Sequence, residues 1–347
     1  MISPSDGRIP ESRGQGKSSC DAVFLVSIRR SHTRSPAIHP HRPRCMKRRS
    51  LGPTAPDIFP IGYGGMSLSE KGRPPEAEAI KTIHAVLDAG IELLELSNVY
   101  NDNDDDIGHN ERLFAKALKS WPGASDRVIV ATKGGRWRYR RRWLIDARPE
   151  QLRRACERSL SALGVERIDL YQLNHPDPNV PFAESMGTLA DLKSEGKIRW
   201  VGISNADLDQ IRVASSIAGI ESVQNRLNPF SRLALKRDEV PYCAKLGIGF
   251  LAYQIYGGRH ARRIGMHPLL KRIGKRHGTS PYSITVAWLL AKSDNVIPLV
   301  GARTIGHVRD ALRGASIELT SEEVKAIDAA RFPKWPLHQR IRRKLAG

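Results

Sequence analysis

The sequence predicts a single α/β domain, a (β/α)₈ TIM barrel. The first observation is a regular alternation of eight short apolar runs with helical patterns, which is typical of parallel βαβ units. The second is length, because the 347 residues exceed the roughly 250 that eight strand–helix units occupy. The third is that no GxGxxG motif follows the first apolar run, which disfavours an open dinucleotide-binding sheet.

The strands are predicted where short apolar runs end in polar residues, the pattern of buried parallel strands. In order, these runs are Ile58–Ile61, Ile91–Glu95, Val128–Thr132, Ile168–Leu173, Ile198–Ile203, Ser222–Asn225, Gly249–Tyr253 and Val296–Val300.

The helices are predicted between and after these strands from apolar periodicity. They are Pro75–Ala89, Glu111–Ser120, Pro149–Leu163, Phe182–Glu195, a short helix from Asp207, Asp238–Leu246, Ser283–Lys292, Ile305–Arg313 and Ser321–Ala330. Gly90, Gly196 and Gly247 each follow a helix, as expected for helix C-termini.

Both ends of the chain differ in composition from the barrel, which we assign to residues 46–335. Residues 1–45 are rich in Ser, Arg, Pro and His without an amphipathic period, so we expect a disordered basic tail. Met46 is then the true or an alternative start, or else the tail is a native disordered segment. Residues 336–347 form a second basic tail.

The formal charge of +20 raises the question of nucleic acid as a partner. The charge lies in separate patches, at the two tails and at Arg136–Trp143, without a recognisable binding motif. Nucleic acid is therefore not expected. No apolar run approaches the ~20 residues of a membrane-spanning helix, so no membrane association is expected either.

The four cysteines lie far apart and show no CxxC spacing, which disfavours disulfides and zinc. The simplest interpretation is a reducing cytoplasm. The acidic stretch Asp102–Asp106 has one histidine nearby, His109, and its spacing fits no metal loop, so we expect no metal site.

Candidate site residues are sought just after each strand, because barrel enzymes carry their chemistry at the carboxyl ends of the strands. In strand order these residues are Glu95 and Tyr100, Lys133, Asn174 and His175, Ser204 and Asn205, Gln224, Tyr253 and Gln254, and Arg303.

Several short segments, in order along the chain, resemble the aldo-keto reductase family from about Met46 to Ala330. They are Leu87–Ile91, Ala131–Gly134, Asp169–Leu173, Gly196–Arg199, Val201–Asn205, Gln224–Arg226, Leu251–Tyr253, Ala287–Leu290 and Ile297–Pro298. The resemblance implies hydride transfer between NADP(H) and an aldehyde or ketone. Tyr100 corresponds to the proton donor, and Lys133 to the lysine expected to lower its pKa.

The resemblance also implies a cofactor site. Ser204, Asn205 and Gln224 would hold the nicotinamide carboxamide, and Tyr253 would stack on its ring. Gly64, Met66 and Gln254 are further expected contacts of the cofactor. Arg303 and His307 match the position of the adenosine phosphate, which favours NADP, with NAD as the alternative. Asp310 matches an acidic contact at the adenine end, where the neighbouring Ala311 departs from the usual Asn.

Two positions depart from the family's Asp–Tyr–Lys–His tetrad. Glu95 replaces the Asp and could still pair with Lys133. Asn174 replaces the His; it cannot titrate but could orient a carbonyl oxygen. His175 could substitute only if the strand has already ended, because successive strand residues face opposite ways.

Two questions stay open at this point. The Arg136–Trp143 run either attracts an anionic substrate or the cofactor, or is a solvated basic loop. The altered tetrad is compatible with a slow reductase, and also with a nicotinamide-binding redox sensor or scaffold that has little turnover. The sequence does not define the oligomeric state.

Overall fold

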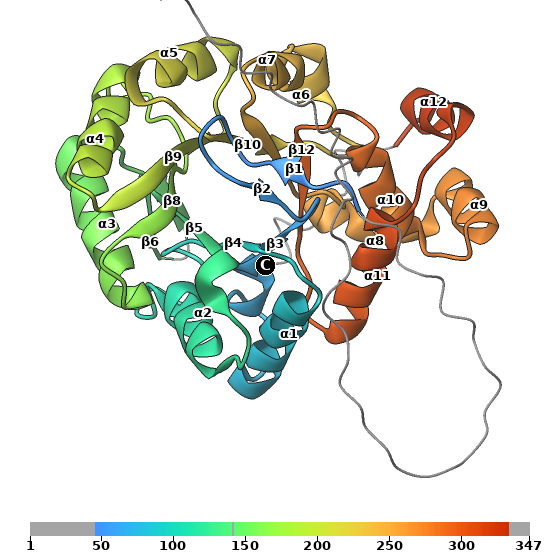
Figure 1. The fold of residues 1–347 in the computed structure, drawn as a ribbon, viewed down its shortest axis with the longest axis horizontal. Helices are drawn as coiled ribbons and strands as arrows, with labels where there is room; N and C mark the ends of the chain where they lie inside the picture. The colour runs from blue at the N-terminus through green and yellow to red at the C-terminus, as the bar shows by residue number, and fades with distance from the viewer. Residues whose placement is uncertain (1–45, 141, 333–347) are drawn as a thin grey trace, which may run out of the picture. The chain divides into compact units, whose positions relative to one another are not determined.

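The computed structural model describes residues 46–140 and 142–332, so the predicted tails lie outside the described residues. Eight parallel strands close into a barrel, which confirms the predicted fold class (Figure 1). In barrel order they are β3 (Gly62–Gly64), β4 (Leu93–Glu95), β5 (Ile129–Gly134), β8 (Ile168–Leu173), β9 (Ile198–Ser204), β10 (Ser222–Arg226), β11 (Gly249–Tyr253) and β12 (Val296–Val300).

The helices surround the barrel (Figure 1). They are α1 (Glu76–Asp88), α2 (His109–Ser120), α3 (Pro149–Leu163), α4 (Phe182–Ser194), α5 (Leu208–Ala218), α6 (Leu233–Lys236), α7 (Glu239–Lys245), α8 (Ala261–Met266), α9 (Pro268–Arg276), α10 (Pro281–Leu290), α11 (Ile305–Ala315) and α12 (Ser321–Ala329). Capping residues define where several helices begin or end. Asp207 and Gln210 form a capping box at the start of α5, and α3 ends at Gly164, which has a φ of 68°.

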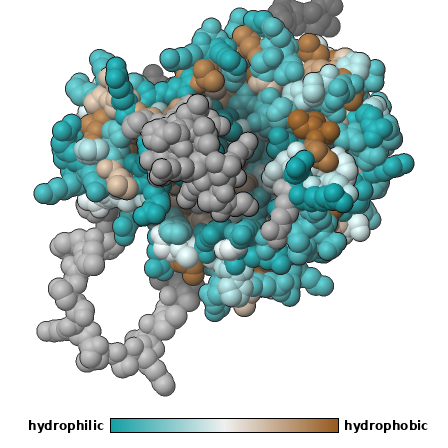
Figure 2. Space-filling view, turned by 180° about the vertical axis from the view of Figure 1, so that it is seen from behind, coloured by the Kyte–Doolittle hydropathy of each residue, from teal (hydrophilic) through white to brown (hydrophobic). Residues whose placement is uncertain are grey.

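The apolar side chains form two clusters. The larger one lies between the strands and the helices and includes Trp288, which is completely buried. The smaller one includes inward-facing strand residues such as Leu170 and Leu251, together with Leu51 and Ile58 from a short N-terminal hairpin. Viewed from behind, the described surface is mostly hydrophilic with scattered hydrophobic residues (Figure 2).

The predicted first strand, Ile58–Ile61, is wrong. Residues 57–58 instead form β2 (Asp57–Ile58), which pairs antiparallel with β1 (Arg49–Ser50). Ile58 is apolar because it packs into the smaller core cluster. The first barrel strand is β3, and a Cβ at Gly62 would lie only 2.8 Å from Leu299. Glycine is needed at this crowded position, and it weakens the apolar signal of the strand.

The sequence prediction also missed elements in the loops. After β5 comes a hairpin of β6 (Arg136–Tyr139) and β7 (Arg142–Ile145), and α8 and α9 follow β11. Among the described residues, no helix combines the length and the apolar character needed to cross a membrane.

Candidate active site

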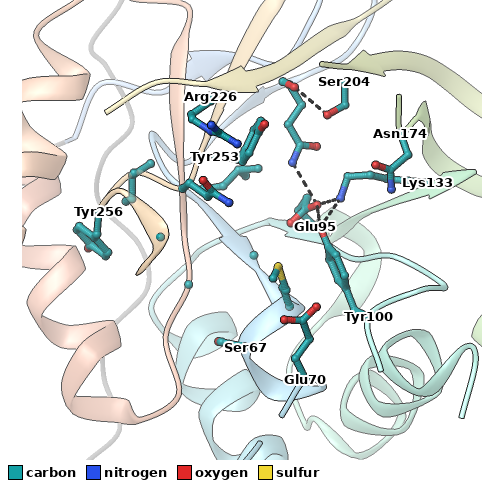
Figure 3. Close-up of a pocket in the computed structure, with 18 of the residues that line it drawn as sticks. Ser67, Glu70, Glu95, Tyr100, Lys133, Asn174, Ser204, Arg226, Tyr253 and Tyr256 are labelled. Carbon is teal, nitrogen blue, oxygen red and sulfur yellow. Dashed lines mark hydrogen bonds and ion pairs between the residues drawn. The ribbon is translucent and has the colours of Figure 1, made fainter. Parts of the chain in front are cut away.

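A pocket of about 900 Å³ opens where the barrel strands end (Figure 3). It brings together all but one of the site residues predicted from the sequence: Gly64, Met66, Glu95, Tyr100, Lys133, Asn174, His175, Ser204, Asn205, Gln224, Tyr253, Gln254, Arg303 and His307. Because these residues come from all eight strand ends and the loops after them, barrel closure is what assembles the pocket.

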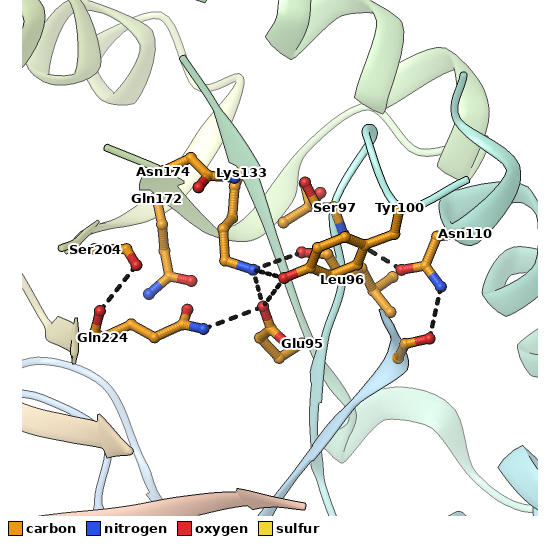
Figure 4. A network of polar contacts seen from close by, with 12 residues as sticks. Glu95, Leu96, Ser97, Tyr100, Asn110, Lys133, Gln172, Asn174, Ser204 and Gln224 are labelled. Atoms are coloured by element: carbon orange, nitrogen blue, oxygen red, sulfur yellow. Dashed lines mark hydrogen bonds and ion pairs between the residues drawn. The ribbon is translucent and has the colours of Figure 1, made fainter. Parts of the chain in front are cut away.

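A buried ion pair between Lys133 and Glu95 forms the centre of the pocket (Figure 4). Lys133 Nζ also donates to the hydroxyl of Tyr100 at 2.9 Å and to the carbonyl of Leu96 at 3.1 Å. The Tyr100 hydroxyl donates in turn to Glu95 Oε1 at 3.3 Å. The prediction that Glu95 pairs with Lys133 is therefore confirmed, and the same carboxylate reaches the phenol.

The pKa of Tyr100 is shifted upward, whereas the family resemblance implies a lowered pKa. Burial raises the pKa of Tyr100 above its ordinary value, the charge of Glu70 raises it further, and Arg136 opposes both. Burial, reinforced by Arg136, lowers the pKa of Lys133 well below its ordinary value. The expected net lowering of the Tyr100 pKa is therefore wrong, because burial outweighs the attraction between a phenolate and the Lys133 ammonium, whose charge Glu95 also balances.

Asn174 and His175 both line the pocket, because β8 ends at Leu173 and neither residue belongs to the strand. The Asn174 backbone is held at both ends: its N–H donates to Gly134 O, and its carbonyl accepts from Asn205 Nδ2, each at 2.8 Å. Its side-chain amide has no hydrogen-bond partner among the described residues and faces the pocket (Figure 3). His175 Nδ1 lies 2.8 Å from the carbonyl of Pro176.

A second wall of the pocket, formed at the ends of β9, β10 and β11, contains a series of polar contacts. Tyr253 donates to Asn205 Oδ1 at 2.6 Å, and Asn205 Nδ2 donates to Ser204 Oγ at 3.1 Å. Gln224 Nε2 donates to Glu95 Oε1 at 3.2 Å, while Gln224 Oε1 is buried and receives no hydrogen bond from the described part of the chain. A buried amide oxygen that lacks a donor fits the –NH₂ of a nicotinamide carboxamide.

Two of the predicted phosphate contacts lie at the start of α11. Arg303 donates to the carbonyls of Ser67 and Lys71, at 3.1 and 3.3 Å, and retains further N–H groups. His307 lies in the first turn of α11, whose N-cap is Thr304.

Asp310 is the predicted site residue that does not line the pocket. Its carboxylate accepts hydrogen bonds from Ser280 and Ser283, which join α11 to α10. These hydrogen bonds satisfy the Asp310 carboxylate between α10 and α11, so the position of Asp310 provides no support for a contact with adenine.

Sequence reasoning missed further pocket residues, including Glu70 and Tyr256, which lie in loops, and Arg226, which is the last residue of β10. Arg136 and Trp143 were noted only as part of a basic loop, and they line the pocket from the β6–β7 hairpin. The two-residue alternation of Arg and aromatic residues from Arg136 to Tyr139 is the signal that could have identified this hairpin.

Comparisons with known proteins identify the family and the fold. The family model for the aldo/keto reductase family matches residues 60–331. The 6-dehydroglucose reductase of Novosphingobium aromaticivorans is 29% identical, over 83% of this chain and 97% of its own length. A thermostable aldo-keto reductase solved with epalrestat is 26% identical with a TM-score of 0.70, over 82% of this chain and 99% of its own.

A third similar structure is an aldo/keto reductase from Klebsiella pneumoniae solved with NADP and acetate. It is 23% identical with a TM-score of 0.70, and the match covers 81% of this chain and 94% of that one. This likeness concerns the fold. Because the family model spans more than half of the chain, the chain belongs to the aldo/keto reductase family.

Proposed function

We propose that this protein is an NADP(H)-dependent oxidoreductase that interconverts a small aldehyde or ketone and its alcohol, with Tyr100 as the proton donor. The observation that carries the proposal is the buried Tyr100 hydroxyl, 2.9 Å from Lys133 Nζ at the centre of the pocket. Bound there, the reduced cofactor would supply a hydride to the carbonyl carbon. Ser204, Asn205 and Gln224 would hold its carboxamide.

The chain's own residues account for the proton. Because burial raises the pKa of Tyr100, the phenol is neutral at neutral pH and holds the proton that the carbonyl oxygen needs. Loss of that proton leaves a phenolate, which the Lys133 ammonium stabilises through the hydrogen bond that already joins them. The Asn174 amide, facing the pocket, orients the carbonyl oxygen.

The proposal favours NADP over NAD. Arg303 and His307 lie at the N-terminus of α11, where a guanidinium and backbone N–H groups suit a phosphate dianion. A dissociation constant for NADPH well below that for NADH would support this preference, and equal constants would contradict it.

A second candidate function is a nicotinamide-binding redox sensor or scaffold with little turnover. The hydrogen bond from Tyr100 to Glu95 favours it, because a carboxylate then holds the proton that catalysis needs. The two candidates differ in a single measurement: tight NADPH binding without turnover across a broad carbonyl panel would support the sensor.

The deciding experiment follows NADPH oxidation by the purified protein with a panel of aldehydes and ketones, and repeats it with Tyr100→Phe. We expect turnover that disappears in the variant, while NADPH binding, measured by fluorescence, is retained. Turnover that persists in Tyr100→Phe would contradict the catalytic assignment.

We also propose that the protein works in the cytoplasm. The described cysteines, Cys156 and Cys243, are free and buried, and burial raises the pKa of each thiol to about 12, so neither is poised for disulfide exchange. Cell fractionation tests this: recovery with an exported marker protein would contradict it.

A further inference from the structure

The β6–β7 hairpin presents two different faces. Arg138 pairs directly with Trp143 across the hairpin, so both side chains lie on one face together with Arg136. The guanidinium carbons of Arg136 and Arg138 lie 5.9 and 5.5 Å from the Trp143 ring centroid. Trp137 and Arg142 lie on the other face and are exposed.

The two inward arginines have different surroundings. Arg138 donates to the carbonyls of Asn101 and Asp102 and lies 3.9 Å from Asp104, so it holds the loop after Tyr100 in place. Arg136 instead lines the pocket. Its Nε is buried without a partner, and among the described residues no oxygen accepts a hydrogen bond from its guanidinium.

Arg136 lies close enough to the reacting groups for its charge to act on them. It lowers the pKa of Lys133 and opposes the rise in the pKa of Tyr100. The carboxyl of Glu70 also lines the pocket, but the arginines that act on it are Arg138 and Arg303. The pocket therefore holds a partly desolvated cation beside Tyr100 with no carboxylate of the described chain to balance it.

We propose that Arg136 binds a carboxylate on the substrate, so that the preferred substrates are carbonyl compounds carrying a carboxylate. This inference rests on the proposed function and narrows its substrate class. A guanidinium presents paired N–H donors that match a carboxylate, and the partial burial of Arg136 strengthens such a pair. Trp143, whose ring meets that of Tyr100 edge-on at 6.3 Å, provides an apolar wall beside it.

Besides Arg303 at the proposed phosphate position, Arg226 is a further pocket arginine that could attract an anion. Its guanidinium lies 5.8 Å from the Tyr253 ring centroid, on the wall assigned to the nicotinamide. A charge at that position would act on the cofactor, whereas Arg136 belongs to the hairpin beside Tyr100. Replacing Arg136 and replacing Arg226 should therefore have different effects.

The test compares 3- and 4-carboxybenzaldehyde with the corresponding carbamoylbenzaldehydes, which are neutral and of similar size. We expect kcat/KM to favour at least one carboxylate isomer by about tenfold or more, the scale of one charge-assisted hydrogen bond. Arg136→Gln should abolish the preference, and Arg136→Lys should retain part of it. Arg142→Gln, which removes the same charge from the outer face of the hairpin, should leave it unchanged.

A binding measurement makes the inference independent of turnover. Calorimetry on the NADPH-saturated protein would compare 3- and 4-(hydroxymethyl)benzoate with their amides, which the reduced cofactor cannot oxidise. We expect tighter binding of a benzoate in the wild type and not in Arg136→Gln. If this holds while no aldehyde is reduced, the carboxylate-binding site at Arg136 stands and the proposed function fails.

Other outcomes overturn the inference. Equal kcat/KM and equal affinity for the carboxylate and amide compounds, with turnover that depends on Tyr100, would contradict the carboxylate site and leave the reductase assignment intact. A preference that survives Arg136→Gln but disappears in Arg226→Gln would move the anion to the other wall. Weaker NADPH binding in Arg136→Gln, with both substrates affected equally, would make Arg136 a cofactor contact.

Discussion

Glu95 Oε1 accepts from three donors at once: Lys133 Nζ, the Tyr100 hydroxyl and Gln224 Nε2. A carboxylate in this position both neutralises the lysine and holds the phenol's proton. The extra methylene of Glu relative to Asp is what extends the carboxylate toward Tyr100. The rate of the enzyme should therefore depend on the length of this side chain.

Glu95→Asp should withdraw the carboxylate from Tyr100 and free the phenol's proton for the substrate. We expect kcat to rise roughly fivefold, the equivalent of the about 1 kcal/mol of one hydrogen bond. Steady-state NADPH oxidation measures it. Glu95→Gln is the control: it keeps the length but leaves a buried cation unpaired, so it should lower the melting temperature. A fall in kcat for Glu95→Asp would show that Glu95 assists the tyrosine.

The pH dependence of reduction follows from the raised pKa of Tyr100. A proton donor acts in its protonated form, so activity is present below its pKa and is lost as the pH rises through it. An ordinary tyrosine titrates near ~10. We expect kcat/KM for reduction to lose no activity to this group between pH 7 and about 10, measured with a carbonyl substrate that does not titrate. An alkaline fall centred near neutrality would contradict this prediction.

At this scale, the sequence identified the site residues that directly follow strands, because the barrel places strand ends together. Position along the chain could not show that Glu95 reaches Tyr100, since this depends on side-chain length and burial. It also could not place Glu70, which lies in the loop after β3 and approaches Tyr100 only in the folded chain (Figure 3).

Among the elements, β8, β11 and β12 match their predicted limits. β11 and β12 are continuous apolar runs that are almost entirely buried, and β8 is a mostly buried run in which Asp169 and Gln172 interrupt the apolar residues. The β6–β7 hairpin was missed because arginine and tryptophan carry its alternation in place of aliphatic residues. Its inward arginines contact the pocket and the Asn101 loop, so its sequence reflects the site more than the core.

The first turn of α2 should respond to acid through His109. Burial lowers the pKa of His109, and Arg73 lowers it further, against the charge of Asp106. Its Nδ1 lies 3.0 Å from Ser69 Oγ, which joins α2 to the loop after β3. A lowered pKa means that the unfolded chain binds the proton first. The stability is therefore complete above the unfolded pKa of about 6.5 and is lost as the pH falls from there through the folded pKa.

Between pH 7.5 and 5.0, we expect the melting temperature of the wild type to fall further than that of His109→Gln. Glutamine keeps a polar side chain at this position but cannot titrate in that range. Differential scanning calorimetry at both pH values gives the comparison. A direct check is an NMR titration, in which the His109 ring should protonate below 6.5. Equal losses in the two proteins would show that protonation of His109 does not affect stability, and a midpoint above that value would show that protonation favours the fold.

For the whole barrel domain, the N-terminal hairpin joins segments that are far apart in the sequence. Arg49 donates to the carbonyl of Val296 at 2.6 Å and to that of Leu290 at 2.7 Å. The carbonyl of Leu51 accepts from Gly249 N at 3.1 Å, and Thr54 donates to buried Glu221. Residues 49–58 thus contact α10, the first residues of β11 and β12, and Glu221 just before β10, at the end of the barrel opposite the pocket. Local sequence patterns do not reveal contacts between segments so far apart.

A truncation series should locate where the folding domain begins. A chain starting at Met46 keeps every contact described for the hairpin, so we expect its melting temperature and NADPH affinity to equal those of the full chain. A chain starting at Phe59 loses Leu51 and Ile58, both fully buried, and leaves Glu221 without its donors. Each lost aliphatic residue costs about 2–5 kcal/mol, so a fall of about 10 °C or more is expected.

The point variant Leu51→Ala separates packing from chain length and should reproduce part of that fall. Calorimetry of the three variants and the full chain, with NADPH binding as the second measurement, makes the comparison. If the chain from Met46 is destabilised as much as the chain from Phe59, residues before Met46 contribute to the fold. If the chain from Phe59 has the same melting temperature as the full chain, the hairpin does not stabilise the barrel.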